Sequence, residues 1–325
     1  MIAVGSAAKS MLPSIFPLLV ASAVPPATKF PDVVEWLGKV HGGSISPSIK
    51  LSTVPVGGNG LVASAAVAAD APLGVVPLRA CVSANAAIRD PDIGCVAREC
   101  LSSYGFGKST PELIVTAALL AHARYCGDVA ARESYGPYAD SLPWGDGALT
   151  IDALEHHPMI RGEDVGGGRL DLYRACASDV LQVLDESVSQ AVAFRAVILA
   201  ASRSMDLSPS WRRSQIAQGQ MDAGGRAPHW AQVMVPILDC TNHPSRLSLE
   251  RAGEPGKRFM RHAESPRQGC IQFTPDWSTG ELRVRAPKGL PLMPGDEVYN
   301  FYGQPSSGSV EETAFIAQFG FSPCD

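Results

Sequence analysis

The sequence of 325 residues lacks the cysteine spacings that mark a structural zinc site or a disulfide framework. Its eight cysteines are scattered, with no Cys-x-x-Cys pair and no matched Cys and His spacing. We therefore expect no metal site. Scattered cysteines of this kind favour reduced thiols in an intracellular protein.

Runs of like charge and long apolar segments are also missing. The chain has 27 Lys and Arg against 32 Asp and Glu, a net charge of -5, and these residues are dispersed. Such a distribution gives no electrostatic footprint for nucleic acid, so no nucleic-acid partner is expected. Outside the N-terminus no stretch is apolar and long enough to span a bilayer, and the G-x-S-x-G pattern of a nucleophile elbow is absent.

The composition nevertheless indicates a folded protein. Hydrophobic residues make up 46% of the chain and charged residues 18%, which is enough apolar surface for a sizeable core. The 31 glycines and 26 prolines indicate many turns around short strands.

The first 28 residues differ from the remainder. Residues 10–28 carry no charge, and a short apolar run ends in an Ala-x-Ala pattern at residues 21–23. Four prolines in this stretch argue against a membrane-spanning helix. Two interpretations stay open, a disordered leader or a targeting segment. The first predicts a cytoplasmic protein and the second an organelle such as a plastid.

Hydrophobic periodicity predicts an α+β fold whose short strands are interrupted by helices. Helices are expected over residues 30–41, 110–127, 170–188, 191–205 and 310–319. Strands are expected over 49–51, 61–69, 73–78, 232–238, 271–273, 282–284 and 298–302, and surface loops over 208–228 and 251–268. A β-rich domain over 29–325 is thus split by a mostly helical insertion at about 109–230.

Three motifs carry chemical information. One is the glycine turn over residues 57–61, where backbone could approach a ligand closely. The second reads Val-Pro-Ile-Leu-Asp-Cys-Thr-Asn-His-Pro over 235–244, and the third Pro-Gly-Asp-Glu-Val-Tyr-Asn-Phe-Tyr-Gly over 294–303. Taken alone, Asp239 and His243 fit a satisfied turn at a strand end, and Tyr302 fits a half-buried strand tyrosine.

Together the motifs resemble the SET-domain protein methyltransferases. The resemblance is to the branch typified by the Rubisco large-subunit lysine methyltransferase, which also contains the actin-histidine methyltransferase. Weaker matches follow in the same order along the chain, and the resemblance covers about residues 29–322. These matches lie at residues 30–37, 58–63, 138–143 and 201–203.

The resemblance implies a cofactor, S-adenosyl-L-methionine, and assigns roles to named residues. Tyr302 is the expected catalytic residue, which holds the acceptor nitrogen. Phe301 and Phe319 are expected to bind substrate. Arg203 corresponds to an arginine that pairs with the cofactor carboxylate. The expected cofactor-binding residues are Gly57, Gly58, Asn59, Gly60, Leu61, Arg203, Asp239, Asn242 and His243.

Two departures from the family pattern keep alternative functions open. Gly57 and Asn59 stand where this branch often has Glu or Arg, and Phe319 stands where lysine-specific members often have Tyr. The leading expectation is a monomeric protein-lysine N-methyltransferase acting on a protein substrate. A protein-histidine N-methyltransferase and a non-catalytic SET-like binding module are the alternatives.

Overall fold

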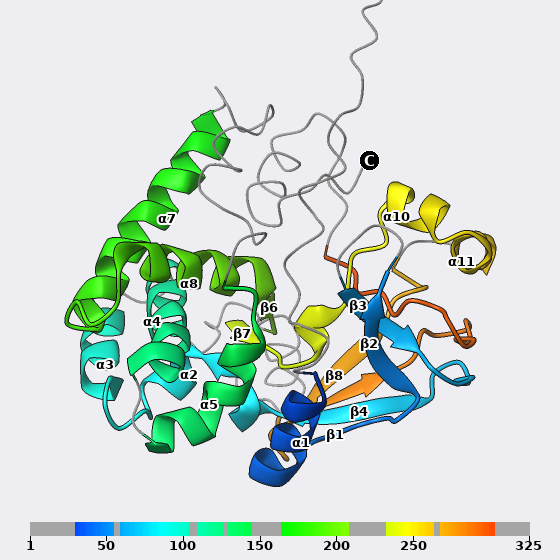
Figure 1. Ribbon diagram of the computed structural model, residues 1–325, viewed down its shortest axis with the longest axis horizontal. Coiled ribbons are helices and arrows are strands. Elements are labelled where there is room, and N and C mark those ends of the chain that lie inside the picture. The colour runs from blue at the N-terminus through cyan, green and yellow to red at the C-terminus, as the bar shows by residue number, and fades with distance from the viewer. Residues whose placement is uncertain are drawn as a thin grey trace, which may run out of the picture.

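The computed structural model describes residues 30–54, 59–103, 109–126, 129–144, 164–207, 232–262 and 267–302 (Figure 1). The predicted leader and the predicted helix over 310–319 lie outside these ranges. Most of the longer helices gather on one side of the molecule, and the largest sheet lies on the other, with strands β6 and β7 between them in this view. This arrangement is the α+β architecture that the sequence predicts.

The helices come mainly from the middle of the chain. The opening helix α1 spans Phe30–His41 as predicted, and Gly42, with φ +71°, follows its end. The other α-helices are α2 (Ala84–Ala87), α3 (Gly94–Ser103), α4 (Ser109–Ala121), α5 (Val129–Ser141), α7 (Asp164–Val183), α8 (Gln190–Arg203), α10 (Arg246–Arg251) and α11 (Glu254–His262).

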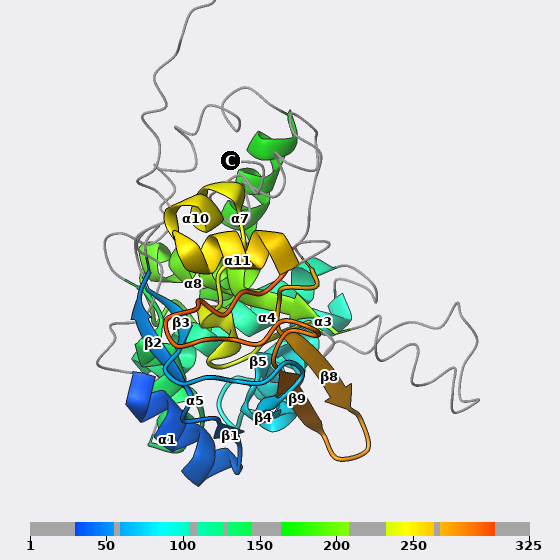
Figure 2. The ribbon, with the colours of Figure 1, turned by 90° about the vertical axis from the view of Figure 1, so that its right-hand side faces the viewer.

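The strands of the described residues form three small antiparallel sheets. Their orders are β1-β4-β9-β8, β2-β3 and β5-β7-β6. The strands are β1 (Ser44–Ile45), β2 (Ile49–Thr53), β3 (Asn59–Ala63), β4 (Pro72–Pro77), β5 (Val82–Ser83), β6 (Ser204–Asp206), β7 (Gln232–Met234), β8 (Gln272–Asp276) and β9 (Glu281–Arg285). The predicted hairpin over 271–284 is confirmed as β8 and β9, and its turn extends away from the rest of the described chain in Figure 2.

Alternating side chains explain how the largest sheet faces the core. In β9, Leu282 and Val284 are buried, while Arg283 and Arg285 between and beyond them are exposed. Successive side chains of a strand point to opposite faces, so this alternation places one face on the core and the other in solvent.

Helix α4 is the central helix of the helical side. Residues 117–121 are all fully buried, and the helix packs against both α7 and α8. A helix that is apolar around its whole circumference must be buried on all sides. It begins at Ser109, one residue before the predicted start at Thr110, and continues into a π-helical turn over His122–Cys126.

Helix α5 contains a proline whose missing hydrogen bond is replaced by another element. Pro137 has no N–H to donate to the carbonyl of Glu133, four residues earlier. That carbonyl instead accepts a hydrogen bond from Trp36 Nε1 of α1, at 3.1 Å. His41 Nε2 lies 3.1 Å from the next carbonyl, that of Ser134. The proline therefore helps to dock α1 on α5.

Several predicted elements are corrected by the structure. The predicted loop over 251–268 is wrong in its first half, because α11 spans Glu254–His262 and packs Phe259 on Tyr299. The predicted strand over 298–302 is also wrong, since this segment makes only isolated β-bridges. The strands expected over 61–69 and 232–238 end early, at Ala63 and Met234.

Seven cysteines lie in the described ranges, and all seven are free thiols. Among the described helices, none combines the length and the apolar character needed to cross a membrane.

Candidate functional site

The motif over 235–244 lies in a tight, buried turn rather than in a strand. After β7 the chain turns at Ile237 and enters a 3₁₀ turn, η5 (Leu238–Cys240). Ile237 has φ +74° and is 2% exposed. A β-branched residue in the left-handed region is strained, and such strain persists only where surrounding structure enforces it. The turn places Asn242 and His243 beside the segment over 297–302.

Backbone and side-chain contacts join the two long motifs over 235–244 and 294–303. Asn242 pairs with Tyr299 in a parallel β-bridge, and the Asn300 amide donates to the Asn242 carbonyl at 2.9 Å. Asn242 Nδ2 also donates to Glu297 Oε1, at 2.6 Å. Residues more than fifty positions apart in sequence are therefore held side by side.

Strand β3 brings the end of the glycine motif to the same place. The Val298 amide donates to the Leu61 carbonyl at 2.7 Å. A Cβ atom at Gly60 would lie 2.7 Å from both Asn242 Nδ2 and Glu297 Oε1. Only glycine permits this approach without displacing a neighbour. Gly57 and Gly58 lie outside the described residues, as does the side chain of Asn59.

His243 is buried and neutral. Burial lowers the pKa of its imidazole to about 4. Its Nδ1 accepts a hydrogen bond from the Tyr302 amide at 3.2 Å, so the ring proton resides on Nε2. Its ring centroid lies 5.7 Å from those of both Phe301 and Tyr302. The histidine thus anchors the last described residues of the chain.

Tyr302 donates its hydroxyl hydrogen to the Thr241 carbonyl. Burial raises the pKa of this phenol above its ordinary value, so the hydroxyl is neutral at physiological pH. A neutral hydroxyl whose hydrogen is already engaged still has oxygen lone pairs that can accept an N–H group. Tyr302 is therefore suited to hold a nitrogen and unsuited to act as a base.

Arg203 and Asp239 form a buried ion pair behind this turn. Arg203 Nη1 lies 2.8 Å from the Asp239 carbonyl oxygen and 3.3 Å from Asp239 Oδ2, and the two side chains are 8% and 1% exposed. Tyr138 of α5 donates to the same Oδ2 at 2.8 Å. Arg203 thus bonds a carboxylate of the protein itself, and its contact with a cofactor carboxylate stays a prediction.

The two predicted substrate residues differ in what the structure describes. Phe301 is half-buried against a small apolar cluster formed by Leu249, Phe259, Cys270, Leu290 and Tyr299. Phe319 lies outside the described residues. The role of both in substrate binding stays a prediction.

Sequence reasoning did not single out Glu297, Tyr138 or Thr241. Glu297 is 8% exposed, and burial raises the pKa of its carboxyl, while hydrogen bonding with the side chains of Asn242 and Tyr299 opposes that rise. Its Oε2 has no hydrogen-bond partner among the described residues. Glu297 and Tyr138 lay inside recognised motifs, but only the fold shows what each one contacts.

A group of potential metal ligands lies away from this site. Oxygen and nitrogen atoms of Asp90, Asp92 and His122 lie within 4.8 Å of one another. Asp90 Oδ1 accepts from the amides of Asp92 and Ile93, and His122 Nε2 bonds Asp92 Oδ2 at 3.0 Å. These bonds connect the end of α4 to the turn before α3, and they account for the cluster without an ion.

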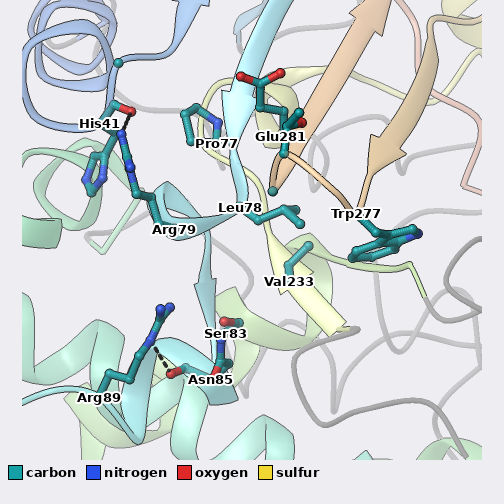
Figure 3. A pocket seen from close by; sticks show the side chains of 13 residues that line it. His41, Pro77, Leu78, Arg79, Ser83, Asn85, Arg89, Val233, Trp277 and Glu281 are labelled. Atoms are coloured by element: carbon teal, nitrogen blue, oxygen red, sulfur yellow. Dashed lines mark hydrogen bonds between the residues drawn. The ribbon is translucent and has the colours of Figure 1, made fainter.

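A cleft of about 410 Å³ opens between the end of α1, strand β4, helix α2 and the turn joining β8 to β9 (Figure 3). Arg79 and Arg89 line it from one side, and Trp277 lines it from the β8–β9 turn. Arg79 Nη2 donates to the His41 carbonyl and Arg89 Nε to the Asn85 carbonyl. Asn242, His243 and Tyr302 are not among the residues that line this cleft.

Comparisons with known proteins place this geometry in a fold class. No protein-family profile and no curated protein sequence matches the chain. Among solved structures, the SET domain of LSMT bound to lysine and AdoHcy superposes with a TM-score of 0.56 at 16% identity over 91% of this chain. Rubisco LSMT bound to AdoMet gives a TM-score of 0.56 at 15% identity over 90% of the chain. The fold is that of a SET domain.

The matched chains are longer than this one. The chain spans 57% of the first LSMT structure and 56% of the second. A third LSMT structure, bound to MeLysine and AdoHcy, gives a TM-score of 0.55 at 15% identity. At these identities the comparison establishes the fold, and the chemistry rests on the residues described above.

Proposed function

We propose that this protein is an S-adenosylmethionine-dependent protein-lysine N-methyltransferase. The observation that carries the proposal is the convergence of Gly60, residues 242–243 and residues 297–302 in a SET fold. LSMT structures of the same fold hold AdoMet, AdoHcy, lysine and MeLysine.

The described residues fit the cofactor. Glu297 Oε2 is a buried acceptor without a partner among the described residues, beside Gly60 and Asn242. The cofactor carries hydroxyl and amino donors that such an acceptor can bind. Asn242, Glu297 and the β3 end of the glycine turn are the residues that would hold it. When bound, S-adenosylmethionine supplies an electrophilic methyl group on a sulfonium.

The chain's own residues then position the acceptor without adding a charged histidine. Tyr302 offers a hydroxyl oxygen to an N–H of the acceptor, because its own hydrogen is bonded to Thr241. His243 stays uncharged, since burial lowers its pKa to about 4. The site therefore adds no histidine charge that would oppose a positively charged methyl donor. Orientation of this kind can supply much of a rate enhancement.

The acceptor itself must be uncharged when it attacks. A lysine has a free pKa of about 10.4, so methyl transfer to lysine should accelerate as pH rises through the alkaline range. Transfer to a histidine, with a free pKa of about 6.5, should already be near its plateau at neutral pH. The pH profile therefore separates the proposed acceptor from histidine.

A direct test uses methyl-labelled S-adenosylmethionine with free L-lysine, free L-histidine and a protein extract as acceptors. We expect label on lysine, both free and in an extract protein whose modified residue is then identified by mass spectrometry. Label on histidine alone would reassign the acceptor. Absence of label from all three, with the cofactor bound, would favour a binding module over an enzyme.

A further inference from the structure

Tyr138 connects the helical side of the molecule to the candidate site. It lies in α5, is 1% exposed, and donates its hydroxyl hydrogen to Asp239 Oδ2 at 2.8 Å, across 101 residues of sequence. Its ring is stacked on that of Trp36, with centroids 6.4 Å apart and planes 9° apart. Trp36 is itself fixed to α5 through the carbonyl of Glu133. The hydroxyl of Tyr138 is therefore held in one position.

Asp239 depends on that hydroxyl because it is a carboxylate with almost no access to water. Burial raises the pKa of the Asp239 carboxyl, and Arg203 and the Tyr138 hydroxyl oppose this rise. Arg203 binds both Oδ2 and the backbone carbonyl of Asp239. Removing one donor from a buried charged group leaves that group undersolvated, and the pair is then free to shift.

A shift of Asp239 would reach Tyr302 through two residues of backbone. Asp239 belongs to the η5 turn, and Thr241 follows directly as its C-terminal cap. The Thr241 carbonyl accepts the hydrogen of the Tyr302 hydroxyl. Arg203 and Asp239 also act on the Tyr302 hydroxyl through their charges, with opposite effects on its pKa. The Tyr302 hydroxyl is therefore bonded to a turn whose position is fixed by hydrogen bonds from Tyr138 and Arg203 to Asp239.

We infer that Tyr138 is a positioning residue for methyl transfer, which fixes the Tyr302 hydroxyl through Asp239 and the turn to Thr241. The inference rests on the proposed function, in which Tyr302 orients the acceptor nitrogen. It gives α5 a role in the reaction, through the bond from Tyr138 to Asp239 and the turn that follows.

The first test measures turnover in Tyr138→Phe, which keeps the ring on Trp36 and removes only the hydroxyl. Methyl transfer to free L-lysine should lose about tenfold in kcat, or about 1.4 kcal/mol, while KM for S-adenosylmethionine changes less than twofold. Unchanged kcat would overturn the inference. A KM increase at constant kcat would overturn it as well, because it would place Tyr138 in cofactor binding.

The matched control is Tyr135→Phe on the same helix. The Tyr135 hydroxyl donates to the Arg79 carbonyl at 3.2 Å, beside the cleft of Figure 3 and away from η5. This variant loses the same atom from the same helix, and we expect kcat within twofold of the wild type. An equal loss in both variants would assign the effect to general loosening of α5 and contradict the inference.

A second measurement needs no acceptor and keeps the inference separate from the proposed function. Urea midpoints are compared for Tyr138→Phe, Tyr302→Phe and the double variant. The double variant should shift less than the sum of the two single shifts, because both hydroxyls stabilise the same turn. Additive shifts would overturn the inference, even if methyl transfer proceeds. If the wild type transfers no methyl group, the proposed function fails while the midpoints still decide whether Tyr138 holds Tyr302.

Discussion

At the scale of single residues, the proposed function depends most on the Tyr302 hydroxyl. Tyr302→Phe keeps the ring and removes the oxygen that would accept the substrate N–H. We expect kcat to fall at least tenfold, about 1.4 kcal/mol or more, with the affinity for S-adenosylmethionine near the wild-type value. Steady-state kinetics with labelled cofactor and calorimetric titration of the variant measure the two quantities. Unaltered turnover would remove Tyr302 from the reaction.

His243 makes a prediction about stability and pH. Its folded pKa of about 4 lies below the unfolded value of about 6.5, so between these values the unfolded chain binds the proton. The free energy of unfolding should therefore fall by about 1.4 kcal/mol per unit as pH drops from 6.5 to 4. Above pH 6.5 this contribution is fully present.

The matched variant is His243→Asn, whose amide oxygen can accept from the Tyr302 amide in place of Nδ1. Urea unfolding of both proteins between pH 4 and 7.5 isolates the histidine, since every other titrating group is shared. The variant should show a shallower slope in the acid range. Identical slopes in the two proteins would mean that His243 is not held neutral by burial.

At the scale of elements, the sequence predicts those helices and strands best whose hydrophobic periodicity lies within the element itself. The helix over 30–41 and the hairpin over 271–284 each show their own periodicity, and both are confirmed. The polar residues over 251–268 predict a loop, but this region contains a helix with one buried aromatic side chain, Phe259. Residues 298–302 look like a strand, but they are fixed by distant partners in isolated bridges.

Helix α5 shows why proline does not always end a helix. Local rules predict a break at Pro137, because the residue cannot donate to the carbonyl of Glu133. The structure continues the helix to Ser141 and satisfies that carbonyl with Trp36, from an element about a hundred residues earlier. Partners supplied by the tertiary fold are invisible to periodicity, so this helix was not predicted.

The approach of β3 to the site gives a prediction at this scale. Gly60→Ala would place a methyl group 2.7 Å from the hydrogen-bonded atoms of Asn242, which is partly buried, and Glu297, which is buried. We expect a loss of about 1–3 kcal/mol in stability, because the strand or the buried hydrogen bond must give way. Chemical denaturation measures this loss.

Gly168→Ala in α7 is the control for the alanine itself. Nothing lies within 4 Å of a Cβ atom built at Gly168, and the position is exposed in a helix. This substitution should stabilise the protein by up to about 1 kcal/mol. Equal effects of the two substitutions would show that the close approach at Gly60 has no energetic consequence.

At the scale of the whole molecule, the candidate site is assembled by the tertiary fold. Gly60, Asn242 and Glu297 come from three distant parts of the chain, and no periodicity brings them together. The resemblance to SET-domain methyltransferases implies that Gly60 and Asn242 share a cofactor site, but it does not single out Glu297. It did not predict that Arg203 is bonded to Asp239, or that Tyr138 reaches the same carboxylate.

The most direct test of the central claim is a calorimetric and thermal titration with S-adenosylhomocysteine, the demethylated product of the cofactor. A ligand that binds only the folded state stabilises it by about 2.7 kcal/mol at a hundredfold excess over its Kd. We predict saturable binding with a rise in Tm for the wild type. Asn242→Ala should bind at least tenfold more weakly while remaining folded. No binding by the folded wild type, or wild-type affinity in Asn242→Ala, would contradict the account of this site.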